Sequence, residues 1–313
     1  MLIVLGIFGE WFVHHPRKWI EQQREELSPL ITEPLLWIGN PLADITDALD
    51  ITGEDAVAIG DYNAPAHDIC FAGLPLRKAN PAPNDIRVLD RGEFLIGWSA
   101  TLRHPVWCAY RISEEVKFPT GKRPGFTKDK SVPNSPASAE YTRSGYDRGH
   151  MVPNYAIVSR FGTVAQKKTF MMTNIAPQTP QLNRGVWQKL ERRIADLWTA
   201  RYGDVWVIVG CISNKRNTIN KTIDIPDGFY QMIIAKEGNC IKAMAMLFSQ
   251  DVSWHEWAAR NLISIDELEA LTGLDFNPNL PQPLQENLEA QLPSRLWPIR
   301  KLDIFELLKL TSS

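Results

Sequence analysis

Five stretches of the chain are rich in aromatic and β-branched residues over strand-like lengths, and they predict buried β-strands. In chain order they read EFLIGWSATL, PVWCAYRIS, DVWVIVGCI, FYQMIIAKE and IKAMAMLFS. A sixth segment, NRGVWQKLERRIADLWTARYG, repeats its apolar residues every three or four positions, which predicts a helix with one buried stripe. The stripe comprises Trp187, Leu190, Ile194, Leu197 and Trp198. Gly203 predicts the C-terminal end of this helix.

The sequence before and after these elements predicts separate regions of the chain. Residues 1–60 predict a helical N-terminal region, residues 61–90 a proline-rich connector, residues 91–280 the main domain, and residues 281–313 a C-terminal extension. The apolar run over residues 2–13 is shorter than the ~20 residues that span a bilayer and lacks a basic start and a clear cleavage site. It is either a degenerate export signal or membrane anchor, or an amphipathic helix that packs against protein. The first alternative predicts a secreted, periplasmic or membrane-anchored protein, and the second leaves the cytoplasm open.

Composition narrows the class of protein without naming a substrate. A chain of 313 residues with 44% apolar and 22% charged residues is ordinary for a soluble globular protein. Because the net charge is −2, any surface that binds nucleic acid must be a local one. The four cysteines form no C-x-x-C pair, which argues against a zinc ribbon or a thioredoxin-like site and leaves disulfides open.

The stretch YTRSGYDRGHMVPN, residues 141–154, carries the first candidate chemistry. In an extended strand Arg148 and His150 point to the same face. A neutral imidazole can take a proton from water and a guanidinium binds phosphate through paired hydrogen bonds, so the two suit attack on a phosphodiester. We interpret Gly149 as allowing the two side chains to approach closely and Pro153 as ending the strand. The plainer alternatives are a buried structural histidine and an ion pair between Asp147 and Arg148.

Three polar residues further along extend the candidate site. Asn183 is either the N-cap of the amphipathic helix or, through its amide oxygen, the one protein ligand of a hydrated Mg²⁺ ion. Glu191 is either a surface carboxylate paired with an arginine or an acceptor that holds metal-bound water. Asn174 is a turn residue at a strand end, or it contacts the substrate or orients His150. Because no dense cluster of acidic residues lies near the motif, a two-metal site is disfavoured.

Taken together, these motifs resemble the DNA/RNA non-specific endonucleases, which are also called ββα-metal or His-Me finger nucleases. The resemblance is carried by DRGH, TNIAPQ and LNRGVWQKLE, and weaker similarity extends over roughly residues 90–280. It implies an α+β fold in which the ββα-metal core accompanies a central antiparallel sheet flanked by helices.

The resemblance also implies a role for each candidate residue. His150 would be the general base that activates water, and Asn183 would be the only direct protein ligand of Mg²⁺, or of Mn²⁺ in its place. Glu191 would anchor the water shell of the metal. Arg148 would contact the phosphate or brace the motif, and Asn174 would support the geometry of the site.

Two further positions bear on how well the chain matches the family. In the basic loop, which we define as residues 119–135, Arg123 matches an arginine that stabilises the charge developing on the phosphate. Ala195 stands where the family often has an arginine one helical turn after the glutamate. Either Arg192 or Arg193 takes its place, or the support for the transition state is weaker in this protein.

The sequence therefore predicts a Mg²⁺-dependent endonuclease that cuts DNA and RNA with little sequence preference. A protein inhibitor and a membrane, bound through the N-terminus, are further candidate partners, and the oligomeric state is open. One alternative is a catalytically weak nucleic-acid-binding module of the same fold, and another is a metal-dependent phosphodiesterase for small substrates.

Overall fold

The computed structural model describes residues 56–58, 69–214 and 217–299, all of which belong to one compact unit that spans residues 47–303. The predicted N-terminal helix and the apolar run over residues 2–13 lie outside the described residues. Within the described part, no helix is long and apolar enough to cross a membrane. The four cysteines are free thiols, which answers the question of disulfides.

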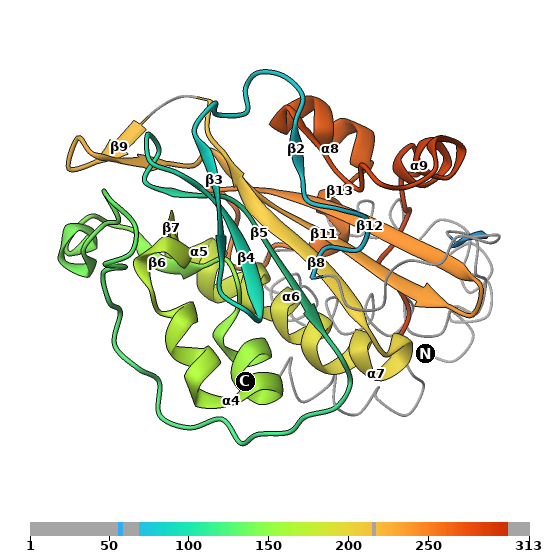
Figure 1. The fold of residues 1–313 in the computed structure, drawn as a ribbon, viewed down its shortest axis with the longest axis horizontal. Helices are drawn as coiled ribbons and strands as arrows, with labels where there is room; N and C mark the ends of the chain where they lie inside the picture. Colours follow the sequence, from blue (N-terminus) through green and yellow to red (C-terminus); the bar gives the residue numbers. More distant parts are fainter. Residues whose placement is uncertain (1–55, 59–68, 215–216, 300–313) are drawn as a thin grey trace, which may run out of the picture. The chain divides into compact units, whose positions relative to one another are not determined.

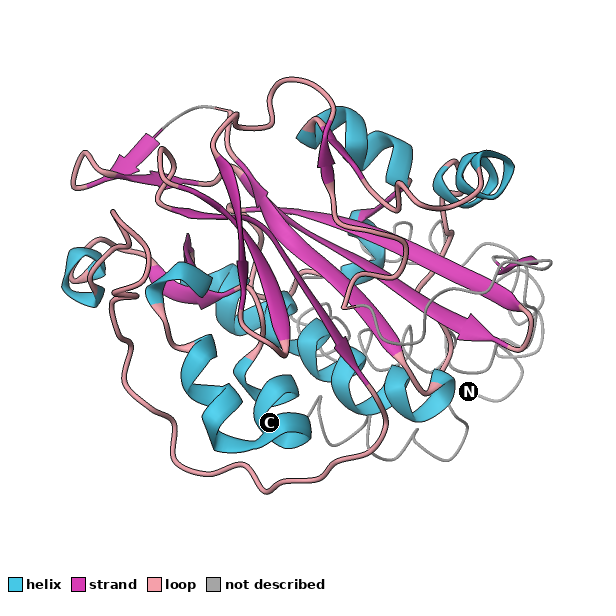
Figure 2. Cartoon of the chain, viewed as in Figure 1, coloured by secondary structure: helices cyan, strands magenta, loops and turns pink. Residues whose placement is uncertain are grey.

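An antiparallel sheet of eight strands forms the centre of this unit (Figure 1, Figure 2). The strand order is β1-β12-β11-β8-β5-β4-β3, and β13 pairs with β12. All five predicted strands are confirmed as members of this sheet. The strands in chain order are β1 (Ala56–Ala58), β3 (Ile86–Asp90), β4 (Phe94–Ser99), β5 (His104–Ile112), β8 (Val205–Ile212), β11 (Gly228–Glu237), β12 (Cys240–Ser249) and β13 (Leu262–Ile263).

Both faces of the central strands are buried, which is why their sequences read as continuous apolar runs. On one face, Ile208 and Tyr230 join a core cluster that includes residues of α8 (Ile265–Thr272) and α9 (Gln282–Glu289). On the other face, the Trp187 ring packs edge-on against Phe229 and Phe248, with ring centroids 5.7 and 6.0 Å away. The sheet thus separates two layers of helices.

One of the two-stranded sheets carries the motif that the sequence singled out. Strands β6 (Asp147–His150) and β7 (Ile175–Gln178) pair antiparallel, with His150 opposite Ile175. Between them lie α4 (Asn154–Thr169) and the short helix η2 (Met172–Asn174). Helical residues then run from 180 to 202, through α5 (Pro180–Leu182), η3 (Asn183–Trp187), α6 (Gln188–Arg192), η4 (Arg193–Trp198) and α7 (Thr199–Tyr202).

This long helix confirms the predicted stripe, since all five of its apolar residues are buried. It ends at Gly203, whose φ of 77° lies in the region that glycine tolerates best. Its start differs from the prediction. Thr179 is the N-cap and accepts a hydrogen bond from the Leu182 amide, so the alternative that made Asn183 the N-cap is wrong. Asn183 has helical dihedral angles and opens a π-helical turn.

The regions outside residues 91–280 contribute to the same unit. Within the segment interpreted as a connector, β2 (Leu76–Arg77) pairs with β14 (Leu274–Asp275), and β3 is an outer strand of the central sheet. After residue 280, α9 joins the core and Trp297 is buried against Trp198. The remaining short elements are η1 (Ser138–Tyr141), β9 (Asn217–Ile219), β10 (Ile223–Ile225) and η5 (Ala258–Asn261).

Candidate active site

A cleft of about 710 Å³ opens where β6, the start of α4, the long helix and the basic loop meet. Five of the six predicted site residues line it, although they come from segments as far apart as residues 123 and 191. They are Arg123, Arg148, His150, Asn183 and Glu191. Asn174 does not line the cleft.

The imidazole of His150 lies in an aromatic box at the wall of the cleft. Its centroid is 5.4 Å from the Phe126 ring and 4.7 Å from the Phe170 ring, which it meets edge-on. The residue is only 8% exposed, and its Nε2 has no hydrogen-bond partner among the described residues. Burial, with the positive charge of Arg123, lowers the pKa of His150 to about 3, so the ring is neutral at neutral pH. A neutral imidazole with a vacant nitrogen is the form that can accept a proton.

Asp147 fixes the orientation of the Asn183 amide. The Nδ2 group of Asn183 donates a hydrogen bond of 2.9 Å to Asp147 Oδ2, so its Oδ1 atom is the one left to act as a ligand. The same carboxylate accepts two hydrogen bonds from the Arg184 guanidinium, at 2.6 and 2.7 Å. Asp147 therefore pairs with Arg184 and not with Arg148, which corrects the plainer interpretation of the Asp-Arg dipeptide.

Glu191 lines the same cleft as Asn183, and the helix between them is not regular. Gly185 departs from helical angles inside the π-helical turn, so the uniform 100° step of an α-helix does not apply over residues 183–191. Burial raises the pKa of Glu191 to about 8, against the lowering effects of Trp187, Arg123 and Arg192. A carboxyl group held in this way gains from any cation that enters the cleft.

The two predicted arginines differ in how firmly they are held. Arg148 donates hydrogen bonds of 3.2 and 2.6 Å to the Ser138 carbonyl, and its guanidinium lies over the Phe126 and Tyr141 rings. Arg123 lies over the Phe170 ring, 5.5 Å from its centroid, and no ion pair to it is present among the described residues. Arg148 is therefore braced at the rim, whereas the charge of Arg123 is available to an anion.

Asn174 is completely buried beneath the site. Its Oδ1 accepts the Val152 amide at 2.9 Å, and its Nδ2 donates to the Val152 and Thr169 carbonyls at 3.0 Å each. Its own carbonyl accepts the Met151 amide at 3.0 Å. These bonds fix the backbone directly after His150, so the geometry fits a positioning residue and not one that touches substrate.

Ala195 is buried, and its carbonyl accepts hydrogen bonds from Arg160 and Thr199. Of the two neighbouring arginines, Arg192 lines the cleft, where its guanidinium stacks 3.7 Å from the Tyr155 ring centroid. Arg193 is buried against Trp198. Of these two arginines, therefore, Arg192 lines the cleft and Arg193 does not.

Other parts of the site were not predicted from the sequence. The role assigned to Gly149 needs correction, since a Cβ atom there would lie 2.0 Å from Oε1 of the buried Gln178. Glycine is required by the side chain of the paired strand and not by the approach of Arg148 to His150. No sequence pattern identifies Phe126 or Phe170 as residues of the site. Gln178 is the last residue of the TNIAPQ motif, which could have drawn attention to it.

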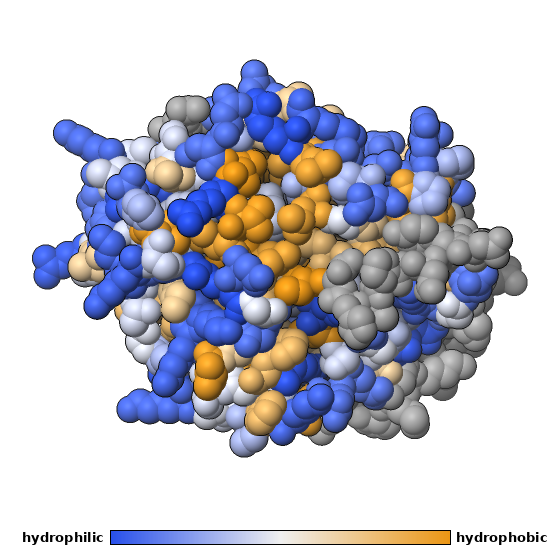
Figure 3. All heavy atoms as spheres, in the orientation of Figure 1, coloured by the Kyte–Doolittle hydropathy of each residue, from blue (hydrophilic) through white to orange (hydrophobic). Residues whose placement is uncertain are grey.

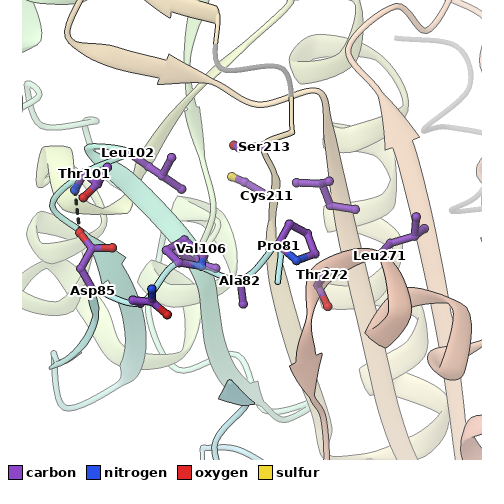
Figure 4. A pocket seen from close by; sticks show the side chains of 13 residues that line it. Pro81, Ala82, Asp85, Thr101, Leu102, Val106, Cys211, Ser213, Leu271 and Thr272 are labelled. Carbon is purple, nitrogen blue, oxygen red and sulfur yellow. Dashed lines mark hydrogen bonds between the residues drawn. The ribbon is translucent and has the colours of Figure 1, made fainter. Parts of the chain in front are cut away.

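Three other features of the described residues are not part of the candidate site as predicted. A smaller cavity of about 220 Å³ is lined by residues that include Asp85, Thr101 and Cys211, and Asp85 already accepts the Thr101 amide (Figure 4). Figure 3 shows apolar side chains gathered near the centre of one face within a polar surface. The acidic groups of Asp266 and Glu289 come together with Glu269 around α8 and α9.

Comparisons with known proteins identify the family of the chain. The family model described as DNA/RNA non-specific endonuclease matches residues 75–283. The chain is 24% identical over 222 residues to a nuclease of Nostoc sp., a match that covers 66% of this chain and 79% of that protein. It is 27% identical over 216 residues to human endonuclease G, mitochondrial, covering 63% and 72%. With the mouse nuclease EXOG, mitochondrial, the identity is 28% over 206 residues, covering 59% of this chain and 55% of that protein.

A solved structure of the EndoG/EndoGI complex contains the same fold. The TM-score is 0.55 at 22% identity, and the match covers 62% of this chain and 87% of the other. The predicted α+β architecture, with its ββα-metal core and central antiparallel sheet, is confirmed. With a family match over 75–283 and the motif residues gathered in one cleft, the chain belongs to the DNA/RNA non-specific endonuclease family, whose members are metal-dependent enzymes that hydrolyse nucleic acids.

Proposed function

We propose that this protein hydrolyses phosphodiester bonds of both DNA and RNA with little sequence preference, using His150 as the general base and one Mg²⁺ ion held by Asn183. The observation that carries the proposal is that the vacant, buried Nε2 of His150 and the oriented amide of Asn183 share one cleft. Substrate choice, metal and residue roles are all part of the proposal.

The donors in the cleft fit a hydrated Mg²⁺ ion. Asn183 offers an amide oxygen, and Asp147 offers a carboxylate that can accept hydrogen bonds from coordinated water. Glu191, whose pKa is raised to about 8, would become such an acceptor once the cation favours its ionised form. When bound, the metal would neutralise charge on the phosphate and stabilise the leaving 3′ oxygen. Mn²⁺ prefers similar oxygen ligands and is expected to substitute.

The chain's own residues account for the other parts of the reaction. His150 removes a proton from water through Nε2, and the water oxygen attacks the phosphorus in line with the leaving oxygen. The box of Phe126 and Phe170 holds the ring in place. Arg123 and Arg192 offer positive charge to the phosphate as its charge develops. Because phosphate contacts carry no information about the base, such a site cuts with little sequence preference.

A plasmid-nicking assay tests this proposal. The wild-type protein is expected to nick supercoiled DNA and degrade RNA with Mg²⁺ and to do neither in EDTA. His150→Ala and Asn183→Ala should each lower the rate by at least ~100-fold, the scale of a lost general base. The matched control is His255→Ala, because His255 is exposed and does not line the cleft. Full cutting by His150→Ala would overturn the assigned base.

A second candidate is a module that binds nucleic acid with weak turnover. It is favoured by the pKa of about 3, which makes the imidazole of the free protein a weak base, and by the buried Ala195. An anionic substrate in the cleft opposes the first effect, since negative charge nearby raises the pKa of an imidazole. Binding in EDTA without cleavage in Mg²⁺ would favour this second candidate.

Two further proposals concern a protein partner of this chain and its compartment in the cell. The EndoG of the similar structure is described in complex with its inhibitor EndoGI, so a protein inhibitor of this chain is a reasonable target for a pull-down experiment. Several relatives are named mitochondrial. We propose export or membrane attachment for this chain, to be tested by cell fractionation.

A further inference from the structure

Trp254 is exposed, unlike the other tryptophans whose burial the structure describes. Its exposed fraction is 48%, whereas Trp187, Trp198 and Trp297 are at most 1% exposed. Tryptophan buries more apolar area than most side chains, so leaving one in water costs free energy that a partner can recover. The position of Trp254 in the fold indicates which kind of partner it contacts.

The segment that carries Trp254 is pinned to the ββα unit by Gln250, which is itself buried. The Gln250 side chain accepts the Thr179 amide at 2.9 Å and donates to the Pro177 carbonyl at 2.7 Å. Its backbone carbonyl accepts the Thr179 hydroxyl at 2.7 Å. These bonds tie the segment to the residue that caps the helix on which Asn183 lies.

Trp254 sits at the tip of a tight turn beside that helix. The Glu256 amide donates to the Ser253 carbonyl at 3.2 Å, which places Trp254 second in a four-residue turn. The Trp254 carbonyl would be 3.7 Å from a Cβ atom on Gly185, so the turn lies directly against the π-helical turn opened by Asn183. The backbone of Trp254 therefore lies beside Gly185, two residues along the chain from the proposed metal ligand Asn183.

Two basic side chains lie on the helix beside this turn, and one of them, Arg184, is paired with Asp147. Arg184 lines the cleft with 62% of its side chain exposed, and it directly precedes Gly185. Lys189 is exposed on the next turn of the same helix. A nucleic-acid strand that leaves the cleft along this helix would pass basic side chains and the turn that carries an exposed indole, which is the combination that binds single strands.

We propose that Trp254 is a stacking platform for an unpaired base of the substrate strand, a short distance from the bond that is cut. The inference rests on the proposed function, because it takes nucleic acid as the occupant of the cleft. It adds a preference for substrate whose bases are free to leave the duplex. Pinning by Gln250 fixes the platform before binding, which lowers the ordering cost of stacking.

Binding is measured in a His150→Ala background with Mg²⁺, so that turnover does not consume the probe. Fluorescence anisotropy follows labelled oligothymidylates of two, six and twelve nucleotides and a blunt twelve-base-pair duplex. Trp254→Ala is expected to weaken binding of the twelve-nucleotide strand by about five- to 150-fold, the range for loss of one stacked base. The loss should shrink for the dinucleotide, which is too short to reach the turn, and for the duplex, whose bases are paired.

Two variants and one optical signal separate stacking from a structural role. Trp254→Phe keeps an aromatic face and should restore most of the affinity. Phe161→Ala removes an exposed aromatic side chain from α4 and should leave the affinity unchanged. A 2-aminopurine base placed at successive positions of the strand should be quenched at one position, and that quenching should disappear in Trp254→Ala.

The outcomes distinguish this inference from the proposed function. Equal affinity of Trp254→Ala and its parent at every strand length overturns the platform, even if the wild-type protein cuts plasmid, and leaves the indole to a protein partner. Length-dependent weakening by Trp254→Ala supports the platform, even if the wild-type protein fails to cut and the binding module is favoured. Failure of Trp254→Phe to restore affinity also counts against stacking.

Discussion

Replacing His150 with asparagine should make the folded protein less sensitive to acid. The pKa of His150 is about 3 in the folded chain, and an unperturbed histidine has a pKa of about 6.5. As the pH falls from 7 to 5, the unfolded chain therefore gains a proton that the folded chain does not take up. The free energy of unfolding contributed by this group is complete above pH ~6.5 and is lost as the pH falls towards 3.

The size of the effect follows from these two pKa values. Between pH 7 and pH 5, protonation of an unfolded histidine lowers the free energy of unfolding by about 2 kcal/mol, provided that the folded ring stays neutral. Asparagine does not titrate, so His150→Asn should lose about 2 kcal/mol less than the wild-type protein over this interval. Any change in stability that the substitution causes at both pH values cancels in the comparison.

Urea denaturation at pH 7 and pH 5, in EDTA to keep the cleft free of metal, measures the four free energies. His255→Asn serves as the matched control, because it makes the same substitution at an exposed histidine that does not line the cleft. If His150→Asn and the wild-type protein lose the same free energy between pH 7 and pH 5, the imidazole already binds a proton in the folded state. Water would then reach the imidazole between Phe126 and Phe170, and the conclusion that burial lowers the pKa of His150 would be wrong.

Three further substitutions test other parts of the site. Asp147→Asn should raise the Mg²⁺ concentration needed for half-maximal nicking by about 10- to 100-fold, because it loosens the amide of Asn183; an unchanged titration would contradict that orienting role. Asn174→Ala should lower the free energy of unfolding by about 2–4 kcal/mol in urea, because it leaves the buried partners of its amide unsatisfied, and a loss below ~1 kcal/mol would argue against that network. Gly149→Ala should destabilise the protein by about 1–3 kcal/mol, and adding Gln178→Ala should recover much of this loss; strict additivity would show that the two side chains do not collide.

Elements with a single strong periodicity were predictable from the sequence. The central strands are buried on both faces and read as unbroken apolar runs, and the helix stripe from Trp187 to Trp198 matches one buried face. α4 was missed because its pattern is broken. Gly162 departs from helical angles with a φ of 81°, and the buried residues include Arg160, which is satisfied by the Ser113 carbonyl. Polar burial of this kind depends on a distant partner that no local pattern reveals.

The residues of the site also differ in whether the sequence could predict them. The cleft residues on β6 and the long helix were predictable because their types suit the chemistry and their motifs are compact. The partner of Asp147 was not, since Arg184 lies 37 positions away and reaches it only when β6 and the helix have docked. The same holds for Phe126 and Phe170, whose contact with His150 depends on how the basic loop and the end of α4 pack.

The packing of Trp297 on Trp198 has a consequence for the order in which the enzyme is made. The Trp198 indole donates to the Trp297 carbonyl at 3.1 Å, across 99 positions of sequence. A ribosome therefore completes Asn183 and Glu191 long before it supplies the ring that covers the far end of their helix. Until translation has passed residue 297, the Trp198 indole lacks both this ring and its hydrogen-bond acceptor, so the burial of the helix is completed only after the residues of the cleft have been made.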